Sequence, residues 1–112
     1  MLSEFESPIV QEKIDSMKAQ GFDVQWLSGL CPVQATGYVD GHPFYWRARG
    51  ATWSIMIAKE KGDYSDEVID APDSWEHIER YGEFPDAGYM PFIEALAFIE
   101  WSAKRWRDSS SV

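Results

Sequence analysis

Two turn signals, Asp40-Gly41 and Gly50-Ala51, constrain the fold of this chain more than any other feature of its sequence. An Asp-Gly pair favours a type I′ turn, with positive φ at both residues, and a glycine in first place favours a type II′ turn. Each turn joins two antiparallel strands and fixes which residues face each other across the hairpin. The spacing of the turns predicts three consecutive antiparallel strands between residues 33 and 57.

Both turns place the same residues on one apolar face. In the first hairpin Trp46 faces Ala35, and in the second hairpin Trp46 faces Ile55. A slip of one residue would turn every side chain of a strand to the opposite face, so this register is strongly specified. Pro43 has no N–H to donate, and pairing of the second and third strands should therefore end near Ile57. The predicted apolar face consists of Val33, Ala35, Phe44, Trp46, Ala48, Trp53, Ile55 and Ile57.

A helix is predicted before these strands, over residues 7–21. Ser7 can cap it, Pro8 suits the first helical position, and Gly21 can end it in the left-handed conformation. The segment after it, residues 22–27, alternates as a strand does, which places Phe22, Val24 and Trp26 on one side. The apolar stripe of the helix consists of Val10, Ile14 and Met17.

A second helix is predicted from Pro91 to Arg107. Phe98 and Trp101 widen its apolar arc, and Glu100 with Lys104 forms an exposed pair at helical spacing. Residues 108–112 are expected to be a frayed tail. The apolar side of this helix carries Phe92, Ala95, Ile99 and Trp106.

The segments between the third strand and this helix are less regular. Residues 59–74 are predicted to form a long acidic loop, and proline and glycines argue against a regular element in residues 82–90. Residues 74–81 leave two interpretations open. Asp73 with Glu76 resembles a helix capping box, and Glu76 with Arg80 is a good helical pair. The aromatic and branched residues of the same stretch suit a short edge strand.

The predicted architecture is a single α+β domain spanning residues 1–112. An antiparallel meander of about four strands has its aromatic face covered by the N- and C-terminal helices. A chain that is 45% hydrophobic and 15% aromatic contains enough apolar surface for a core. No apolar run is long enough to cross a bilayer, and the N-terminal residues lack the pattern of a signal peptide.

The single cysteine, Cys31, excludes an internal disulfide, so a cytoplasmic location is expected. Cys31 itself is expected to be a small buried hydrophobic residue. Its sequence surroundings show no helix start that would activate a thiolate. His42 is interpreted as a polar residue beside a turn, and no metal site, cofactor or catalytic residue is predicted.

Most of the net charge of −9 lies in residues 59–90, where ten Asp and Glu stand against three Lys and Arg. Direct binding to nucleic acid is disfavoured, because phosphate contacts need clustered Lys and Arg. A protein partner with a basic surface is favoured instead, although the same charge could serve solubility alone. The candidate binding residues of the acidic loop are Asp63, Asp66, Glu67, Asp70 and Asp73.

The polar face of the predicted meander is a second candidate binding surface. Arginine beside tyrosine can stack on an aromatic ring or bind a carboxylate with two hydrogen bonds, which suggests a docking site for an acidic or aromatic group. Two alternatives stay open: ordinary pairing on a solvated sheet face, and an acidic loop that folds back and neutralises the arginines. The candidate residues of this face are Tyr38, Tyr45, Arg47, Arg49 and Met56.

The middle of the chain resembles a loosely defined group of small bacterial and phage-borne proteins. The elements that carry the resemblance are PVQA, DG, PFY and RARG within residues 32–50, a tryptophan at position 53, and part of the final helix. These elements belong to a hairpin sheet and bring no catalytic residues with them. What the resemblance implies is an origin in bacteria or in a mobile element.

Three functional hypotheses follow from these features. The first is a small acidic, non-enzymatic interaction protein, of the inhibitor or immunity type, that engages a basic protein surface. The second is a small-molecule or peptide site on the Tyr/Arg sheet face, with a homodimer as one way to close over it. The third is an enzyme that uses His77 with loop carboxylates.

Overall fold

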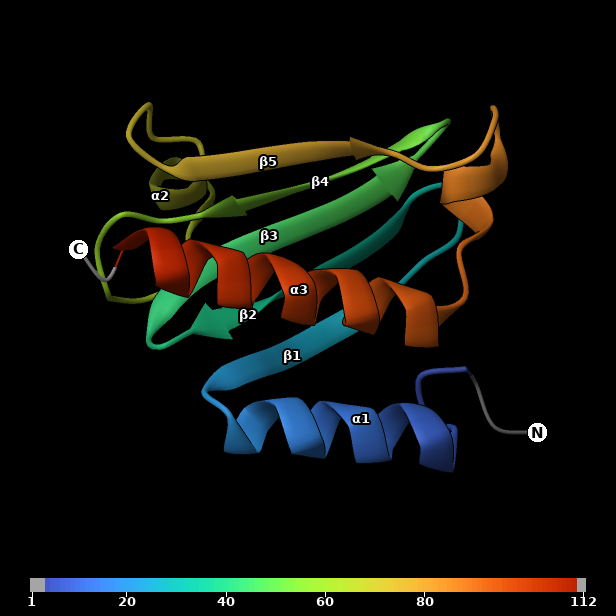
Figure 1. The fold of residues 1–112 in the computed structure, drawn as a ribbon, viewed down its shortest axis with the longest axis horizontal. Helices are drawn as coiled ribbons and strands as arrows, with labels where there is room; N and C mark the ends of the chain where they lie inside the picture. Colours follow the sequence, from blue (N-terminus) through green and yellow to red (C-terminus); the bar gives the residue numbers. More distant parts are fainter. Residues whose placement is uncertain (1–3, 111–112) are drawn as a thin grey trace.

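The computed structural model describes residues 4–110 and shows a five-stranded antiparallel sheet with a helix before it and a helix after it (Figure 1). The strands lie in the order β1-β2-β3-β4-β5, each beside its neighbour in sequence. The predicted α+β meander is therefore confirmed, with five strands in place of about four. The elements are α1 (Pro8–Ala19), β1 (Phe22–Ser28), β2 (Val33–Val39), β3 (His42–Arg49), β4 (Thr52–Ile57), α2 (Asp66–Ile69), β5 (Trp75–Arg80), the 3₁₀ helix η1 (Asp86–Tyr89) and α3 (Phe92–Ser110).

The register that the two turns predict is confirmed at every pair. Trp46 faces Ala35 on one side and Ile55 on the other. Both residues of the first turn have positive φ, 51° at Asp40 and 84° at Gly41, as a type I′ turn requires. Pairing of β3 with β4 ends at Phe44 and Ile57, one residue before Pro43 would have to donate.

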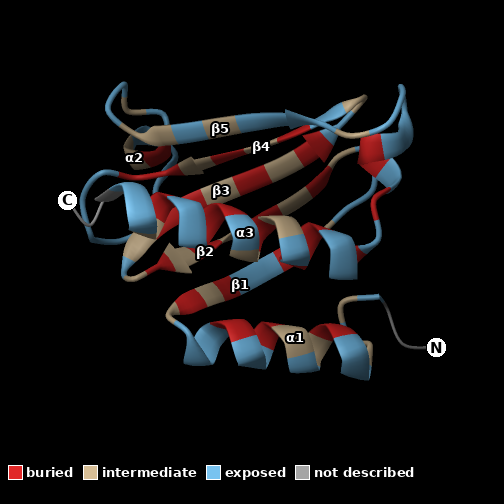
Figure 2. Ribbon diagram, in the orientation of Figure 1, coloured by how far each residue is buried: buried red, intermediate tan, exposed pale blue. Residues whose placement is uncertain are grey.

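The helices cover one face of the sheet, called here the inner face. The core lies between this face and the helices (Figure 2). Phe44 and Trp46 are fully buried there. Val10, Ile14 and Met17 of α1 are buried as expected. Gly21 follows α1 with a φ of 93°, as predicted for a residue that ends a helix in the left-handed region. Ser7 holds the N-cap position, but its hydroxyl makes no capping hydrogen bond.

One prediction for β1 is wrong. The pairing of β1 with β2 shifts between Val24 and Trp26, so a β-bulge changes the alternation halfway along the strand. Trp26 is 44% exposed and lies opposite Thr36, whereas Leu27 takes the buried position. The predicted apolar side of Phe22, Val24 and Trp26 therefore holds for its first two members alone.

The acidic half of the chain is more regular than its composition suggests. The ambiguous residues 74–81 contain β5, an edge strand paired with β4. The acidic loop includes the short helix α2, and the 82–90 segment includes η1, two elements that were not expected. The predicted frayed tail is also wrong as far as Ser110, because α3 continues to that residue, and residues 111–112 lie outside the described part of the chain.

Polar contacts tie α3 to α1. Glu100 accepts hydrogen bonds from Lys13 Nζ and from Gln20 Nε2, both at 2.9 Å. These bonds hold Glu100 against α1, whereas an exposed pair with Lys104 was expected. Within residues 4–110 there is no helix with the length and apolar character that crossing a membrane requires.

Candidate binding surfaces

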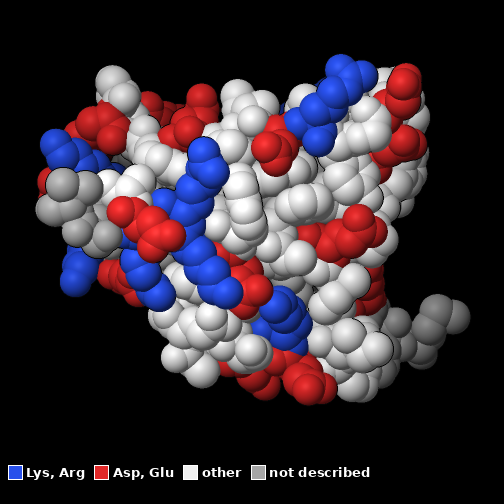
Figure 3. All heavy atoms as spheres, viewed as in Figure 1, with Lys and Arg blue, Asp and Glu red and all other residues white. Residues whose placement is uncertain are grey.

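The acidic segment, residues 59–90, presents all its carboxylates to solvent. Each of its ten Asp and Glu residues is exposed. Among residues 4–110, none of the ten has a Lys or Arg nitrogen within ion-pair distance, although Glu100 and Asp40 elsewhere do form such pairs. Figure 3 shows Asp and Glu residues near α2 and β5 and beyond the end of β5. The negative charge of this segment is therefore not neutralised within the described fold.

The segment is held in place by α2. Ser65 caps this helix, and its Oγ accepts a hydrogen bond from the N–H of Val68 at 3.1 Å. Ser74 Oγ donates back to the carbonyl oxygen of Val68 at 3.2 Å, and Ile69 is 2% exposed. A buried side chain and two local hydrogen bonds fix the backbone that carries the carboxylates. The predicted residues Asp63, Asp66, Glu67, Asp70 and Asp73 all lie on this anchored stretch and are exposed.

The face of the sheet opposite the helices, called here the outer face, carries the predicted Tyr/Arg residues. Register places Arg47 between Gln34 and Ser54, and Thr52 between Arg49 and Arg80. A shallow cavity of about 270 Å³ is lined by Arg47, Arg49, Thr52 and Ser54. Arg47, Arg49 and Arg80 form what we call the arginine corner.

The tyrosine end of the outer face is partly occupied by the acidic segment. Tyr45 donates a hydrogen bond to Gln34 Oε1 at 2.6 Å, and Tyr38 Oη accepts one from the N–H of Tyr64 at 3.1 Å. Burial raises the pKa of Tyr45, the charge of Arg47 opposes that rise, and the charge of Asp66 adds to it. Met56, opposite Tyr45, is half-buried.

The acidic segment therefore folds back over the tyrosines, as one of the three interpretations proposed. It does not neutralise the arginines, because none of Arg47, Arg49 and Arg80 forms an ion pair within the described residues. All five residues predicted for the outer face lie on it. Trp26 also lies there, because the bulge in β1 turns it outward.

A third surface was missed by sequence reasoning. It is a groove on the inner face between α3 and β5, where α3 leaves the edge strand incompletely covered. A cavity of about 410 Å³ in this groove is lined by Glu79, Ala97, Phe98 and Trp101. Residues other than Lys, Arg, Asp and Glu make up much of the surface between α3 and β5 in Figure 3. We call this cavity with its aromatic surroundings the aromatic groove; its members are Trp53, Trp75, His77, Glu79, Phe98 and Trp101.

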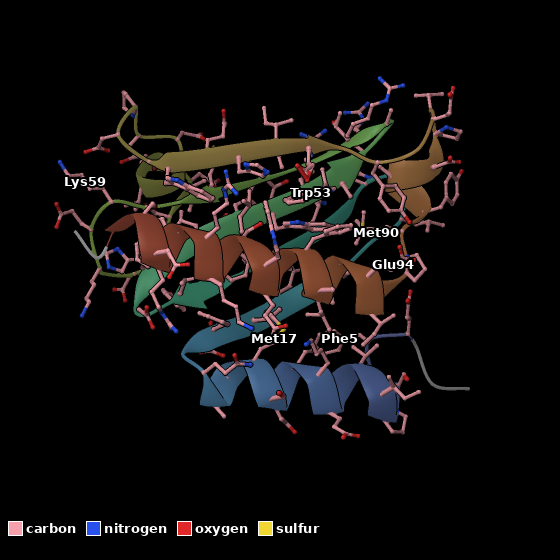
Figure 4. The ribbon with its side chains drawn as sticks, viewed as in Figure 1. Phe5, Met17, Trp53, Lys59, Met90 and Glu94 are labelled. Carbon is pink, nitrogen blue, oxygen red and sulfur yellow. The ribbon has the colours of Figure 1, made fainter. Side chains whose placement is uncertain are left out.

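Trp53 lies buried beneath the groove, on the side of β4 that faces α3 (Figure 4). Its side chain is 1% exposed and stacks on Phe98 with ring centroids 4.9 Å apart. Trp101 stands at 90° to it, 6.3 Å away, and is 42% exposed. The sequence contained one signal of this groove. Phe98 and Trp101 make the apolar side of α3 wider than the stripe that packs against the sheet.

His77 is surrounded by tryptophan rings. Its ring centroid lies 5.6 Å from Trp53, 6.0 Å from Trp75 and 5.2 Å from Trp101. Its Nε2 is buried, makes no hydrogen bond to a described residue, and lies 3.5 Å from Glu79 Oε1. No loop carboxylate from residues 59–74 lies within ion-pair distance of His77 in the described chain, so the structure does not assemble the suggested pairing of His77 with loop carboxylates.

The remaining candidate groups are placed separately. Cys31 is exposed, which corrects the expectation of a buried residue, and its N–H donates to the carbonyl oxygen of Gly88 at 2.7 Å. His42 Nδ1 lies 3.0 Å from the carbonyl oxygen of Ala58, and its ring packs against Trp106. Within residues 4–110, no three His, Cys, Asp or Glu side chains are arranged to hold a metal ion.

Comparisons of the chain with protein-family models, with curated proteins and with solved structures find no match. The resemblance to small bacterial and phage-borne proteins stays a prediction. The functional argument therefore rests on the three surfaces described above.

Proposed function

We propose that this chain is a non-enzymatic binding protein that engages a basic surface of another protein through its acidic segment. The observation that carries the proposal is the set of ten exposed carboxylates without a Lys or Arg partner in the described fold. Where that basic surface itself handles nucleic acid, binding would block it, and the protein would act as an inhibitor or immunity-type protein. We place this function in the cytoplasm, because the chain has a single cysteine and no internal disulfide.

Electrostatics supports this choice of partner. Opposite surface potentials speed the encounter of two proteins and disfavour partners of like charge. The acidic segment need not break an ion pair with Lys or Arg before it meets a cation, since none of its carboxylates makes one within residues 4–110. The anchoring of α2 also lowers the entropy lost on binding, because the carboxylates already sit on ordered backbone.

Affinity capture from an extract of the source cells tests the proposal. The variant Asp66→Asn, Glu67→Gln, Asp70→Asn, Asp73→Asn removes four negative charges and changes little else in shape. The control, Arg47→Ala with Arg49→Ala, alters charge on the outer face instead. We expect wild type and control to capture the same basic proteins and the neutralised variant to lose them. Retention of those proteins by the neutralised variant would contradict the proposal.

A second candidate function is favoured by the arginine corner. Arg47 and Arg49 line a polar cavity together with two hydroxyl side chains, and neither arginine forms an ion pair within the described residues. Guanidinium groups in this setting suit a carboxylate or phosphate group of a small molecule or peptide. A homodimer that closes over this face is compatible with that role.

The second candidate has its own test. Titration with inorganic phosphate and with acetate, followed by NMR of the arginine side chains, should shift Arg47 and Arg49 together. The double variant Tyr45→Ala, Arg47→Ala should lose the response and stay folded. If Lys18→Ala, an exposed cation on α1, reduces the response as much as the double variant does, the arginine corner is not a specific site.

A further inference from the structure

We infer that the aromatic groove is an anchor pocket for a lysine or arginine side chain of the basic partner. This inference rests on the proposed function and adds a specific site to it. One side of the groove is formed by β5, which belongs to the acidic segment and carries Trp75, His77 and Glu79 on the inner face. A partner seated on the acidic segment would therefore have the groove within reach.

The lining of the groove fits a cation with an aliphatic stem. Glu79 is the one charged residue among those that line its cavity, beside Ala97, Phe98 and Trp101. A tryptophan face attracts a cation through its quadrupole, and the attraction grows when water is partly excluded. The aliphatic stem of a lysine or arginine can cover apolar surface while its charged head stays near a carboxylate. The cavity of about 410 Å³ has the size of a small-ligand site.

The carboxylate of Glu79 in the groove is accessible to such a cation. The side chain of Glu79 is 46% exposed, and its nearest ion-pair neighbour in the described chain is His77 Nε2 at 3.5 Å. No Lys or Arg of the described residues lies within ion-pair distance of Glu79. A cation from a partner would thus find a carboxylate that has no Lys or Arg partner in the described chain, in the same groove as an exposed tryptophan ring.

The chain shows that the ring of Trp101 accepts such a group. The guanidinium carbon of Arg105, one helical turn further along α3, lies 5.2 Å from the centroid of the Trp101 ring. Arg105 is exposed and forms no ion pair within residues 4–110. Arg105 therefore competes with a cation from the partner for the Trp101 ring. The cation has to displace Arg105 or share the ring with it.

This competition predicts opposite effects for removing the groove's binding groups and for removing its competitor, Arg105. Removal of the carboxylate in Glu79→Gln, or of the aromatic face in Trp101→Leu, should weaken cation binding. Removal of the competitor in Arg105→Ala should strengthen it. A purely structural role of these residues would not produce that pair of signs.

The experiment uses the full chain and three capped amino acids as probes: lysine, Nε-trimethyllysine and norleucine, the last being a neutral analogue with a similar stem. Binding is followed by the NMR signals of the tryptophan indole N–H groups at millimolar probe. We expect both cations to shift the Trp101 signal and norleucine to bind at least about fivefold more weakly. Glu79→Gln should weaken lysine binding about fivefold, and Arg105→Ala should strengthen it about twofold to threefold.

Glu76→Gln is the matched control, because Glu76 lies on the same strand and is exposed but faces the outer side of the sheet. This variant should bind lysine as wild type does. Norleucine binding equal to lysine, or an unchanged affinity in both Glu79→Gln and Arg105→Ala, would overturn the inference. Thermal unfolding of Trp101→Leu checks that its loss of binding is not a loss of fold. If that variant unfolds, Glu79→Gln alone decides the question.

The same variants separate this inference from the proposed function. If the basic partner is captured through Asp66, Glu67, Asp70 and Asp73 but Glu79→Gln leaves its affinity unchanged, the anchor pocket is wrong and the function stands. If lysine binds in the groove but neutralisation of the loop carboxylates leaves capture intact, the proposed function is wrong while the pocket stands.

Discussion

Arg107 Nε and Nη2 donate to the two carboxylate oxygens of Asp40, at 2.9 and 2.6 Å. Asp40 belongs to the type I′ turn between β2 and β3, and Arg107 lies near the end of α3. Arg107 Nη2 also donates to the carbonyl oxygen of Gln20 at 2.8 Å, and its guanidinium lies 4.5 Å from the ring centroid of Phe22. One side chain thus joins α3, the end of α1 and the first hairpin.

Replacement of Arg107 by lysine should destabilise the fold. Lysine keeps the charge but cannot donate two parallel hydrogen bonds to Asp40 or lie flat over Phe22. We expect Arg107→Lys to lower the free energy of unfolding by about 1 to 2 kcal/mol, measured by urea denaturation. Arg105→Lys is the control, since Arg105 is exposed and has no ion pair in the described chain. Equal losses in the two variants would show that the contact with Asp40 contributes nothing of its own.

Trp46 should contribute more to stability than any surface tryptophan. Its side chain is fully buried between Ala35 and Ile55, so Trp46→Ala removes a large apolar volume that neighbours cannot refill. We expect a loss of about 3 to 5 kcal/mol in chemical denaturation. Trp26→Ala, at a site 44% exposed on the outer face, should cost less than about 1 kcal/mol. A melting temperature unchanged by Trp46→Ala would contradict the register of the meander.

The meander was predictable because its register is set locally. Each turn joins strands over two residues, so Asp40-Gly41 and Gly50-Ala51 specify the pairing without knowledge of the rest of the fold. The position of Trp26 was not predictable in the same way. The bulge in β1 that turns Trp26 outward arises in pairing with β2, which no short motif in the sequence announces.

The candidate surfaces also differ in whether local sequence or long-range packing determines them. The outer face followed from the alternation of β3 and β4, and the exposure of the acidic residues followed from their charge. The aromatic groove depends on how far α3 reaches over β5, and that is decided by packing between segments distant in sequence. Residues 74–81 illustrate the difficulty, because helical pairs such as Glu76 with Arg80 compete with strand propensity, and pairing with β4 determines the outcome.

Gly37 should tolerate no side chain. A Cβ at this position would overlap the carbonyl oxygen of Asp23 and would lie 2.9 Å from Cε2 of Phe44. Relief would require β1 and β2 to separate next to the bulge. We expect Gly37→Ala to cost about 2 to 3 kcal/mol in denaturant unfolding. Thr36→Ala, the neighbouring outward position, should cost well under half as much, and similar costs for the two variants would refute the close approach.

The bond between Glu100 and Lys13 should make stability depend on pH in the acid range. The hydrogen bond from Lys13 lowers the pKa of Glu100 below its ordinary value of 4.5, although burial opposes the shift. A carboxyl whose pKa falls on folding stabilises the folded state above its unfolded pKa and loses that contribution as pH drops through the folded value.

Glu100→Gln should therefore destabilise the protein by about 1 kcal/mol at neutral pH, and the difference from wild type should shrink below pH 4.5. Urea unfolding of both proteins across this range measures the effect. Glu12→Gln, on the exposed side of α1, is the control and should show no such convergence. A gap between wild type and Glu100→Gln that stays constant down to acid pH would mean that the ionised form of Glu100 makes no special contact.

The most direct test of the central claim is the salt dependence of the affinity for the captured basic partner. Calorimetric titrations between about 0.05 and about 0.5 M salt span the range in which surface charges become screened. We expect the wild-type dissociation constant to rise steeply across this range. The variant neutralised at Asp66, Glu67, Asp70 and Asp73 should bind weakly throughout, with a shallow slope. An affinity that is independent of salt, or equal for the two proteins, would contradict binding through the acidic segment.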